Sequence, residues 1–359
     1  MEVECFTELS EAQRGEWCDF LACSEHQHPR QDPRFAEIEK TLGRSVLFAI
    51  GREGKAIRGI GLLSLIPHPL LPGRWRQAVC LSGPICDDAA TMAEFLHALA
   101  KHPTMQTVGS LHITPYWLDE DAASLDLILH AERWRPGELD RFRSTGLVDL
   151  SGKPEDILSR FSKSARRELR RAERQGTNLR MLSGADEAVE FRESLNRLHA
   201  SRGLAAIDAA AFLVGWDAIY RHGDVGTILG AFKDGQFLGG LQLMRSRDVA
   251  HGRYFTTEPE ALRAAGNLRI SPALWFEGML WAKSRGCLFL DVEGYRLPEA
   301  GDAKYNIYKY KSELGPALAS RISERAITLH PLIHLTGNAR SSLRYHLRLL
   351  KKRARTTRL

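Results

Sequence analysis

The chain has 359 residues, of which 43% are hydrophobic and 26% are charged. This composition excludes a disordered chain, which lacks apolar residues, and a fibrous chain, which needs a glycine repeat. The net charge of +6 is unevenly distributed, because segments 160–180 and 344–359 carry a large excess of basic residues. The remainder of the chain is therefore acidic, and at roughly 100–200 residues per domain the length predicts two domains.

The first half of the chain predicts a β-hairpin followed by further sheet elements. Apolar runs at 45–50 and 57–66 flank a turn that contains Gly51 and Gly54, and glycine supplies the positive φ that a tight turn requires. The elements expected next are a strand at 78–81, a helix at 91–101 and a strand at 107–113. A helix at 122–133 and a strand at 146–150 precede a linker at 149–154.

The same order recurs in the second half. The strands expected at 227–232 and 237–244 form another hairpin, followed by a strand at 251–256, a helix at 272–283 and a strand at 287–292. Three of these elements lie 180 or 181 residues after their counterparts. A shared offset predicts two copies of one α/β unit, with the order strand, strand, strand, helix, strand. We therefore expect mixed sheets flanked by helices in domains 1–148 and 149–328, followed by a basic tail at 329–359.

Targeting and catalytic signatures are mostly absent from the sequence. The N-terminus lacks the basic and apolar regions of a secretory signal, and no apolar run reaches the length of a membrane span. The six cysteines form no CxxC pair, which favours reduced thiols and a cytoplasmic localisation. Cys18, Cys23, His26 and His28 match no zinc spacing, so no metal is expected. Neither a nucleophile elbow nor a P-loop nor a zinc-protease motif occurs.

Four stretches of the second half carry a family resemblance. A basic helix at 164–176 ends in an Ala-x-x-x-Gly turn; it is followed by 198–203, 281–291 and 308–315. In this order they resemble the FemABX-type aminoacyltransferases and FemAB-like acyltransferases of the GNAT superfamily. The resemblance covers about half of the chain. It implies an α/β (α+β) fold of two tandem GNAT-like domains, of which the second carries most of the transfer site and the first is mainly structural or acceptor-binding.

This sequence differs from the family pattern in two respects. Tyr310 and Leu314 stand where the family has Phe around Lys311, and the coiled-coil arm of some peptidoglycan-bridge members is missing. The resemblance still implies that Lys311 stabilises charge at the transferring acyl group; the alternative is a solvated lysine at a strand end. Asp291 alternates with Glu293 on the last strand and could orient or deprotonate an amine, although a solvated acidic pair explains them equally well.

The residues expected to bind substrate lie on other segments. His199 and Arg202 are three positions apart on one helix and could face the same cleft, where Arg202 would clamp an acceptor anion. The alternatives are a packing role for His199 and a surface ion pair from Arg202 to Glu193 or Asp208. Tyr254 is expected near the cleft, or equally as a cross-strand core aromatic.

Aromatic and cationic residues alternate at 304–311, where Tyr308 and Tyr310 are interleaved with lysines. This pattern suits stacking against a nucleotide or a tRNA end, and a half-exposed strand would give the same alternation.

Two basic elements predict anionic partners. The first is a cationic helical face formed by Arg166, Arg167, Arg170, Arg171 and Arg174. It suits tRNA, a nucleotide-linked precursor or an anionic membrane, unless Glu168 and Glu173 merely neutralise it. The second is the tail, where leucines at 343, 347 and 350 among basic residues predict an amphipathic helix. Such a helix would lie on anionic lipid at the inner face of the membrane, with RNA as the competing partner.

The donor is expected to be a co-substrate, either aminoacyl-tRNA or acyl-CoA, and no bound cofactor is expected. The segment that is most similar to a coenzyme-A loop is 263–268, in which Leu268 replaces the small residue that a pyrophosphate requires. The resemblance implies transfer to an amine of an anionic cell-wall or polysaccharide precursor. One alternative is an acyl-CoA- or acyl-carrier-dependent N-acyltransferase acting on an amino sugar or small amine. Another is a non-catalytic RNA- or membrane-binding scaffold.

Overall fold

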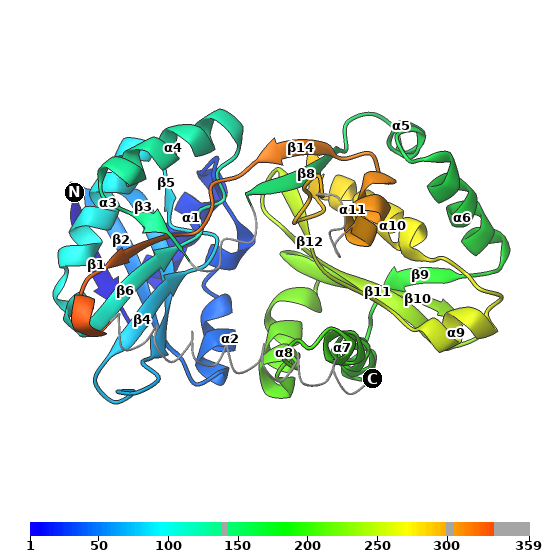
Figure 1. Ribbon diagram of the computed structural model, residues 1–359, viewed down its shortest axis with the longest axis horizontal. Coiled ribbons are helices and arrows are strands. Elements are labelled where there is room, and N and C mark those ends of the chain that lie inside the picture. Colours follow the sequence, from blue (N-terminus) through cyan, green and yellow to red (C-terminus); the bar gives the residue numbers. More distant parts are fainter. Residues whose placement is uncertain (138–142, 299–304, 334–359) are drawn as a thin grey trace, which may run out of the picture.

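The structure, a computed structural model, describes residues 1–137, 143–298 and 305–333. Its two mixed β-sheets lie side by side, each flanked by helices (Figure 1). The first sheet has the order β1 (Glu2–Phe6), β2 (Ser45–Glu53), β3 (Ala56–Pro67), β4 (Arg76–Cys80), β6 (Val108–Ile113), β15 (Arg325–Thr328) and β7 (Arg135–Pro136), with β5 (Ile85–Cys86) paired to β3.

The second sheet repeats this plan. It has the order β14 (Ala317–Ser320), β8 (Ser144–Asp149), β13 (Phe289–Asp291), β12 (Val249–Thr257), β11 (Gln236–Arg245), β10 (Gly226–Lys233) and β9 (Asn178–Met181). In each sheet an antiparallel hairpin leads to a third strand that pairs in parallel with the last core strand, β4 with β6 and β12 with β13. The helices α3 (Ala89–Lys101) and α10 (Ser271–Ser284) connect these parallel strands. The predicted tandem fold is therefore confirmed.

Two strands cross the domain boundaries drawn from the sequence. β8 pairs with β13 and β14 and belongs to the second sheet, although it begins before residue 149. β15 returns to the first sheet and pairs with β6 and β7, which covers an edge of β6 that would otherwise leave backbone groups unpaired. Of the predicted tail, only residues 329–333 are described, and the expected amphipathic helix lies outside the described residues.

Helices cover both sheets and the junction between them. Those not yet named are α1 (Glu11–Cys23), η1 (Pro29–Gln31), α2 (Phe35–Thr41), η2 (Pro103–Thr107), α4 (Asp119–Ala131), α5 (Pro154–Ser159), α6 (Lys163–Arg174), α7 (Ala185–Ser201), α8 (Ala209–Gly215), η3 (Trp216–Tyr220), α9 (Pro259–Ala264) and α11 (Tyr305–Ser312). Within the described ranges, no helix is long and apolar enough to cross a membrane.

One apolar cluster joins the two halves. Trp17 and Phe48 of the first half are buried in the same cluster as Phe191 and Trp216 of the second. Because burying aromatic side chains supplies much of the free energy of packing, this shared cluster fixes one sheet against the other. Residues of the first half can therefore influence a site in the second.

Candidate active site

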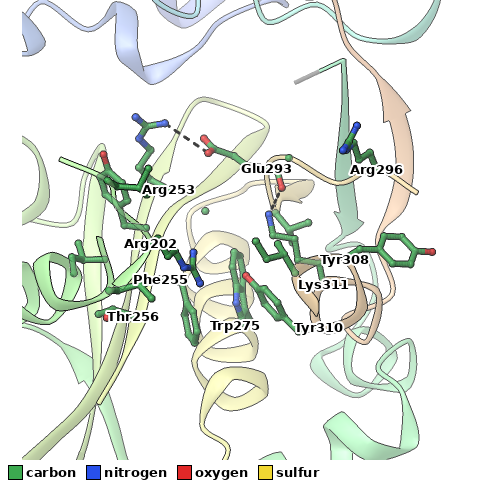
Figure 2. A pocket seen from close by; sticks show the side chains of 18 of the residues that line it. Arg202, Arg253, Phe255, Thr256, Trp275, Glu293, Arg296, Tyr308, Tyr310 and Lys311 are labelled. Atoms are coloured by element: carbon green, nitrogen blue, oxygen red, sulfur yellow. Dashed lines mark hydrogen bonds and ion pairs between the residues drawn. The ribbon is translucent and has the colours of Figure 1, made fainter. Parts of the chain in front are cut away.

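A cavity of about 770 Å³ lies in the second half, where β12 and β13 part. The two strands pair only from Val249 to His251 and from Phe289 to Asp291, after which β12 continues along β11. The cavity is lined by the part of β12 beyond its pairing with β13, by the segment that follows β13, by the end of α7, and by helices α10 and α11 (Figure 2). An opening between parallel strands is a common place for ligands in mixed sheets.

A β-bulge in β12 shapes one wall of the cavity. Gln242 pairs with Tyr254 and Leu243 pairs with Gly252, so Arg253 is an extra residue in β12. A bulge re-aims side chains, and residues 252–257 around this one all contribute to the lining of the cavity, among them Arg253 and Tyr254. Tyr254 lines the cavity and also packs against the core cluster that joins the two halves.

An aromatic surface forms the floor. Phe255 of β12 stacks at a centroid distance of 6.4 Å on Trp275 of α10 and at 6.1 Å on Tyr310 of α11. Burial raises the pKa of Tyr310 above its ordinary range, so this phenol stays neutral. Tyr308 also lines the cavity and stacks on Tyr295 at 5.2 Å.

Lys311 lies in the wall of the cavity as a nearly buried cation with 9% of its surface exposed. The interpretation of 304–311 as a half-exposed strand is wrong for the described part, because Tyr305–Ser312 form α11. Its helical spacing exposes Lys309 and turns Lys311 inward. The Lys311 Nζ donates a hydrogen bond to the backbone carbonyl of Glu293 (Figure 2). Burial lowers the pKa of Lys311 below its ordinary value, and the nearby carboxylates of Glu293 and Asp291 partly oppose this shift.

The structure places Asp291 elsewhere than expected. Its side chain is fully buried and does not line the cavity. It accepts hydrogen bonds from the Tyr116 hydroxyl at 2.7 Å, from Thr145, and from the Glu293 backbone N–H at 2.6 Å. The two acids therefore do not face the same side, and Glu293 alone reaches the cavity.

The other predicted substrate-binding residues line the cavity at the end of α7. His199 faces Tyr254 at a centroid distance of 6.1 Å, and its Nδ1 is 2.8 Å from the Ala205 carbonyl. Arg202 directly follows α7 and is exposed at the cavity. Among the described residues it forms no ion pair with Glu193 or Asp208, which contradicts that alternative.

The charge around the cavity is strongly positive. In the described part of the chain, one acidic residue, Glu293, lines the cavity beside five basic residues, Arg143, Arg202, Arg253, Arg296 and Lys311. Glu293 lies 3.8 Å from the guanidinium of Arg253. A cleft lined by one sign of charge attracts ligands of the opposite sign, so the cavity favours an anionic ligand. Arg253 and Trp275 were not predicted as site residues from the sequence. Arg253 lies at a β-bulge, which leaves no signal in the hydrophobic periodicity. Trp275 has the sequence context of an ordinary core residue of a helix.

The predicted basic face of α6 lies outside the cavity and is divided. Arg166 donates to the Ser159 carbonyl at 2.7 Å, and Arg171 donates to the Gly266 carbonyl at 2.6 Å. Arg167 pairs with Glu168 at 3.2 Å. The remaining two, Arg170 and Arg174, are exposed. Two of the five arginines thus anchor the helix to neighbouring backbone, a third pairs within the helix, and Arg170 and Arg174 remain open to an anionic partner.

In the loop before α10, three backbone N–H groups donate hydrogen bonds to carbonyls of the preceding helix α9. The amides of Gly266 and Asn267 donate to the Arg263 carbonyl, and the amide of Leu268 donates to the Leu262 carbonyl. Leu268 is itself buried in the core. A pyrophosphate at a helix N-terminus needs free N–H groups, and the amides of Gly266, Asn267 and Leu268 are not free.

Comparison with known proteins identifies the fold. No family model matches the chain, and no curated protein matches it. FemX superposes with a TM-score of 0.78 at 16% identity, over 94% of this chain and 100% of FemX. A tandem GNAT protein from the clavulanic acid biosynthesis pathway gives 0.52 at 12% identity, over 91% and 99%. The C-terminal domain of a putative lysylphosphatidylglycerol synthetase from Agrobacterium fabrum gives 0.52 at 15%, over 88% and 92%. The chain therefore has a FemABX-type fold of two tandem GNAT-like units.

Proposed function

We propose that this chain is an acyltransferase that moves an aminoacyl or acyl group onto an amine of a cell-wall or polysaccharide precursor. The observation that carries the proposal is the nearly buried Lys311 in the wall of a cationic cavity with an aromatic floor. When an amine attacks a carbonyl, negative charge develops on the carbonyl oxygen. A cation in a water-poor site stabilises that charge far more than one in bulk water.

The transfer needs no covalent nucleophile from the protein. The amine nitrogen bonds to the carbonyl carbon, and the bond from that carbon to the carrier breaks. The amine proton goes to the released carrier atom, which is the ribose oxygen of a tRNA or the sulfur of a thioester. The protein then has to hold two substrates in contact and stabilise charge. Arg202 and Arg253 support recognition of an anionic acceptor, and the aromatic floor suits a sugar, base or acyl chain.

The donor that these observations favour is an aminoacyl-tRNA. In the loop before α10, the amides of Gly266, Asn267 and Leu268 are bonded to backbone carbonyls and are not free for the diphosphate of coenzyme A. The exposed Arg170 and Arg174 lie on a helix that packs against α10, since Leu169 and Ala172 contact Ala273. A cationic surface beside the site would bind the phosphates of an RNA donor.

The test is a transfer assay with two donors. The purified chain is incubated with tRNA that carries labelled amino acids, or with labelled acetyl-CoA, and with nucleotide-linked sugar and sugar-peptide precursors that bear a free amine. We expect label to move from the tRNA to a precursor. Transfer from acetyl-CoA alone would replace the aminoacyl donor, and binding of RNA without any transfer would favour a scaffold.

Arg202→Ala tests acceptor recognition in the same assay. Loss of a charge-assisted contact should raise KM for an anionic acceptor roughly tenfold and leave kcat nearly unchanged. The matched control is Arg197→Ala in α7, the helix that Arg202 directly follows, because Arg197 pairs with Glu258 at 2.8 Å and does not line the cavity. Equal KM values for the two variants would contradict the role of Arg202.

A further inference from the structure

A buried polar cluster connects the two halves directly behind the cavity. Tyr116 follows β6 in the first half, and its hydroxyl donates a 2.7 Å hydrogen bond to Asp291 of the second half. Both side chains are buried. A hydrogen bond to a buried carboxylate is among the stronger contacts in proteins, because the charged partner is otherwise left desolvated. This contact therefore fixes the position of Asp291 from the neighbouring half.

Asp291 in turn holds the backbone corner at Glu293. One carboxylate oxygen accepts both the Thr145 hydroxyl and the Glu293 N–H. Glu293 has a φ of 50°, a conformation that costs free energy in a residue with a side chain and persists only where surrounding contacts impose it. The corner thus depends on Asp291 for its shape.

The same corner supplies the acceptor for Lys311. The Glu293 carbonyl accepts a hydrogen bond from the Lys311 Nζ (Figure 2). A continuous series of contacts therefore runs from Tyr116 through Asp291 and Glu293 to the cation of the cavity. His251 is buried against this series, but its Nδ1 lies 3.8 Å from Asp291, beyond hydrogen-bond distance.

We propose that Tyr116 is a positioning residue: through Asp291 and the Glu293 corner, the first half holds the Lys311 ammonium in place. The first half then contributes to the site although Tyr116 does not line the cavity. The importance of this placement for transfer rests on the proposed function, whereas the coupling between Tyr116 and Lys311 is a property of the fold and is measurable without substrate.

The test is competitive labelling of lysines with trace acetic anhydride, followed by mass spectrometry of the peptides. Removing the hydroxyl in Tyr116→Phe should free the corner and raise labelling of Lys311 roughly tenfold, because a bond to a charged group is lost. The internal control is Lys283, whose Nζ also donates to a backbone carbonyl, that of Leu150, at 2.9 Å. General loosening raises labelling of both lysines, so the ratio of Lys311 to Lys283 decides.

The control variant is Thr114→Val in the same loop. The Thr114 hydroxyl accepts a 2.7 Å hydrogen bond from the Ser82 N–H and does not touch Asp291, so the labelling ratio should stay at the wild-type value. An unchanged ratio in Tyr116→Phe would overturn the proposal. If Lys311→Ala leaves transfer intact, the proposed function fails while the labelling result stands. If Lys311→Ala abolishes transfer and Tyr116→Phe leaves the ratio unchanged, only the positioning role fails.

Discussion

The two halves of the molecule differ at one equivalent position of the repeated unit, which is filled in the first half and open in the second. Gln242 of β11 lies 180 residues after Leu62 of β3, and it pairs with Tyr254 beside the bulge where the cavity opens. In the first half the Leu62 N–H instead donates to the side chain of Gln31 at 2.7 Å, and the Gln31 amide donates to the Leu81 carbonyl at 2.7 Å. Gln31 is fully buried. One inserted side chain thus fills in the first half the position that is open in the second.

The helices on the two sheets differ in the same sense. Phe95 of α3 is fully buried and packs closely over Gly51 and Gly59. Trp275 of α10 packs on Gly252 and also forms part of the cavity floor. Duplication therefore supplies one unit with a filled interior, which is suited to support, and one unit with an open interior, which is suited to ligand binding.

We expect the largest loss of stability when the hydrogen bonds of the buried Gln31 side chain are removed from the first half. Gln31→Leu leaves the buried N–H of Leu62 and the carbonyl of Leu81 without partners, which should lower the free energy of unfolding by about 2–4 kcal/mol. Urea unfolding measures this, with the exposed Gln106→Leu as a control near wild type. Labelling of Lys311 should be unaffected. If Gln31→Leu is as stable as wild type, Gln31 is not the residue that fills the first half.

A smaller loss is expected from crowding the open half. A Cβ on Gly252 would lie 2.3 Å from the Trp275 ring, so Gly252→Ala should force the indole to move and cost about 1–3 kcal/mol. Displacement of Trp275 should also quench or shift its fluorescence and impair ligand binding. Gly184→Ala is the control, because a Cβ there meets nothing within 4 Å. Equal stability of the two variants would show that β12 and α10 are not in close contact.

The smallest change is a gain in stability from removing the buried cation. Burial lowers the pKa of Lys311 in the folded chain, so between that value and the ordinary value the unfolded chain binds more protons. Stability therefore rises with pH across this window, and below it the burial of the charge is fully unfavourable. Lys311→Met should raise the free energy of unfolding by about 1 kcal/mol at pH 7 and remove this rise with pH. Urea unfolding at pH 7 and pH 10 measures both, and destabilisation at pH 7 relative to Lys309→Met would contradict the account.

Most helices and strands could be predicted from the sequence, because each produces its own local pattern of apolar residues. The hairpins, the helices and their common offset follow from apolar spacing and glycine turns. The edge strands β8 and β15 change sheets through contacts between distant parts of the chain, so the boundaries at 148 and 328 could not anticipate them.

The site was readable only in part. Lys311, Arg202, His199 and Tyr254 all line one cavity, and their roles in binding or transfer stay predictions. The burial of Asp291 was not foreseen, because its partner Tyr116 is 175 residues away in the chain. Alternating Tyr and Lys residues around Tyr308 suited a strand as well as a helix, and only the tertiary structure distinguishes the two.

The most direct test of a transfer site in the second half compares two lysines of α11. Lys311→Ala removes the buried cation, and Lys309→Ala removes an exposed cation two residues away that does not line the cavity. In the aminoacyl-transfer assay, Lys311→Ala should lower kcat by about 10²–10³ with an unchanged melting temperature or a higher one, and Lys309→Ala should retain wild-type kcat. Full activity of a folded Lys311→Ala variant would contradict the account.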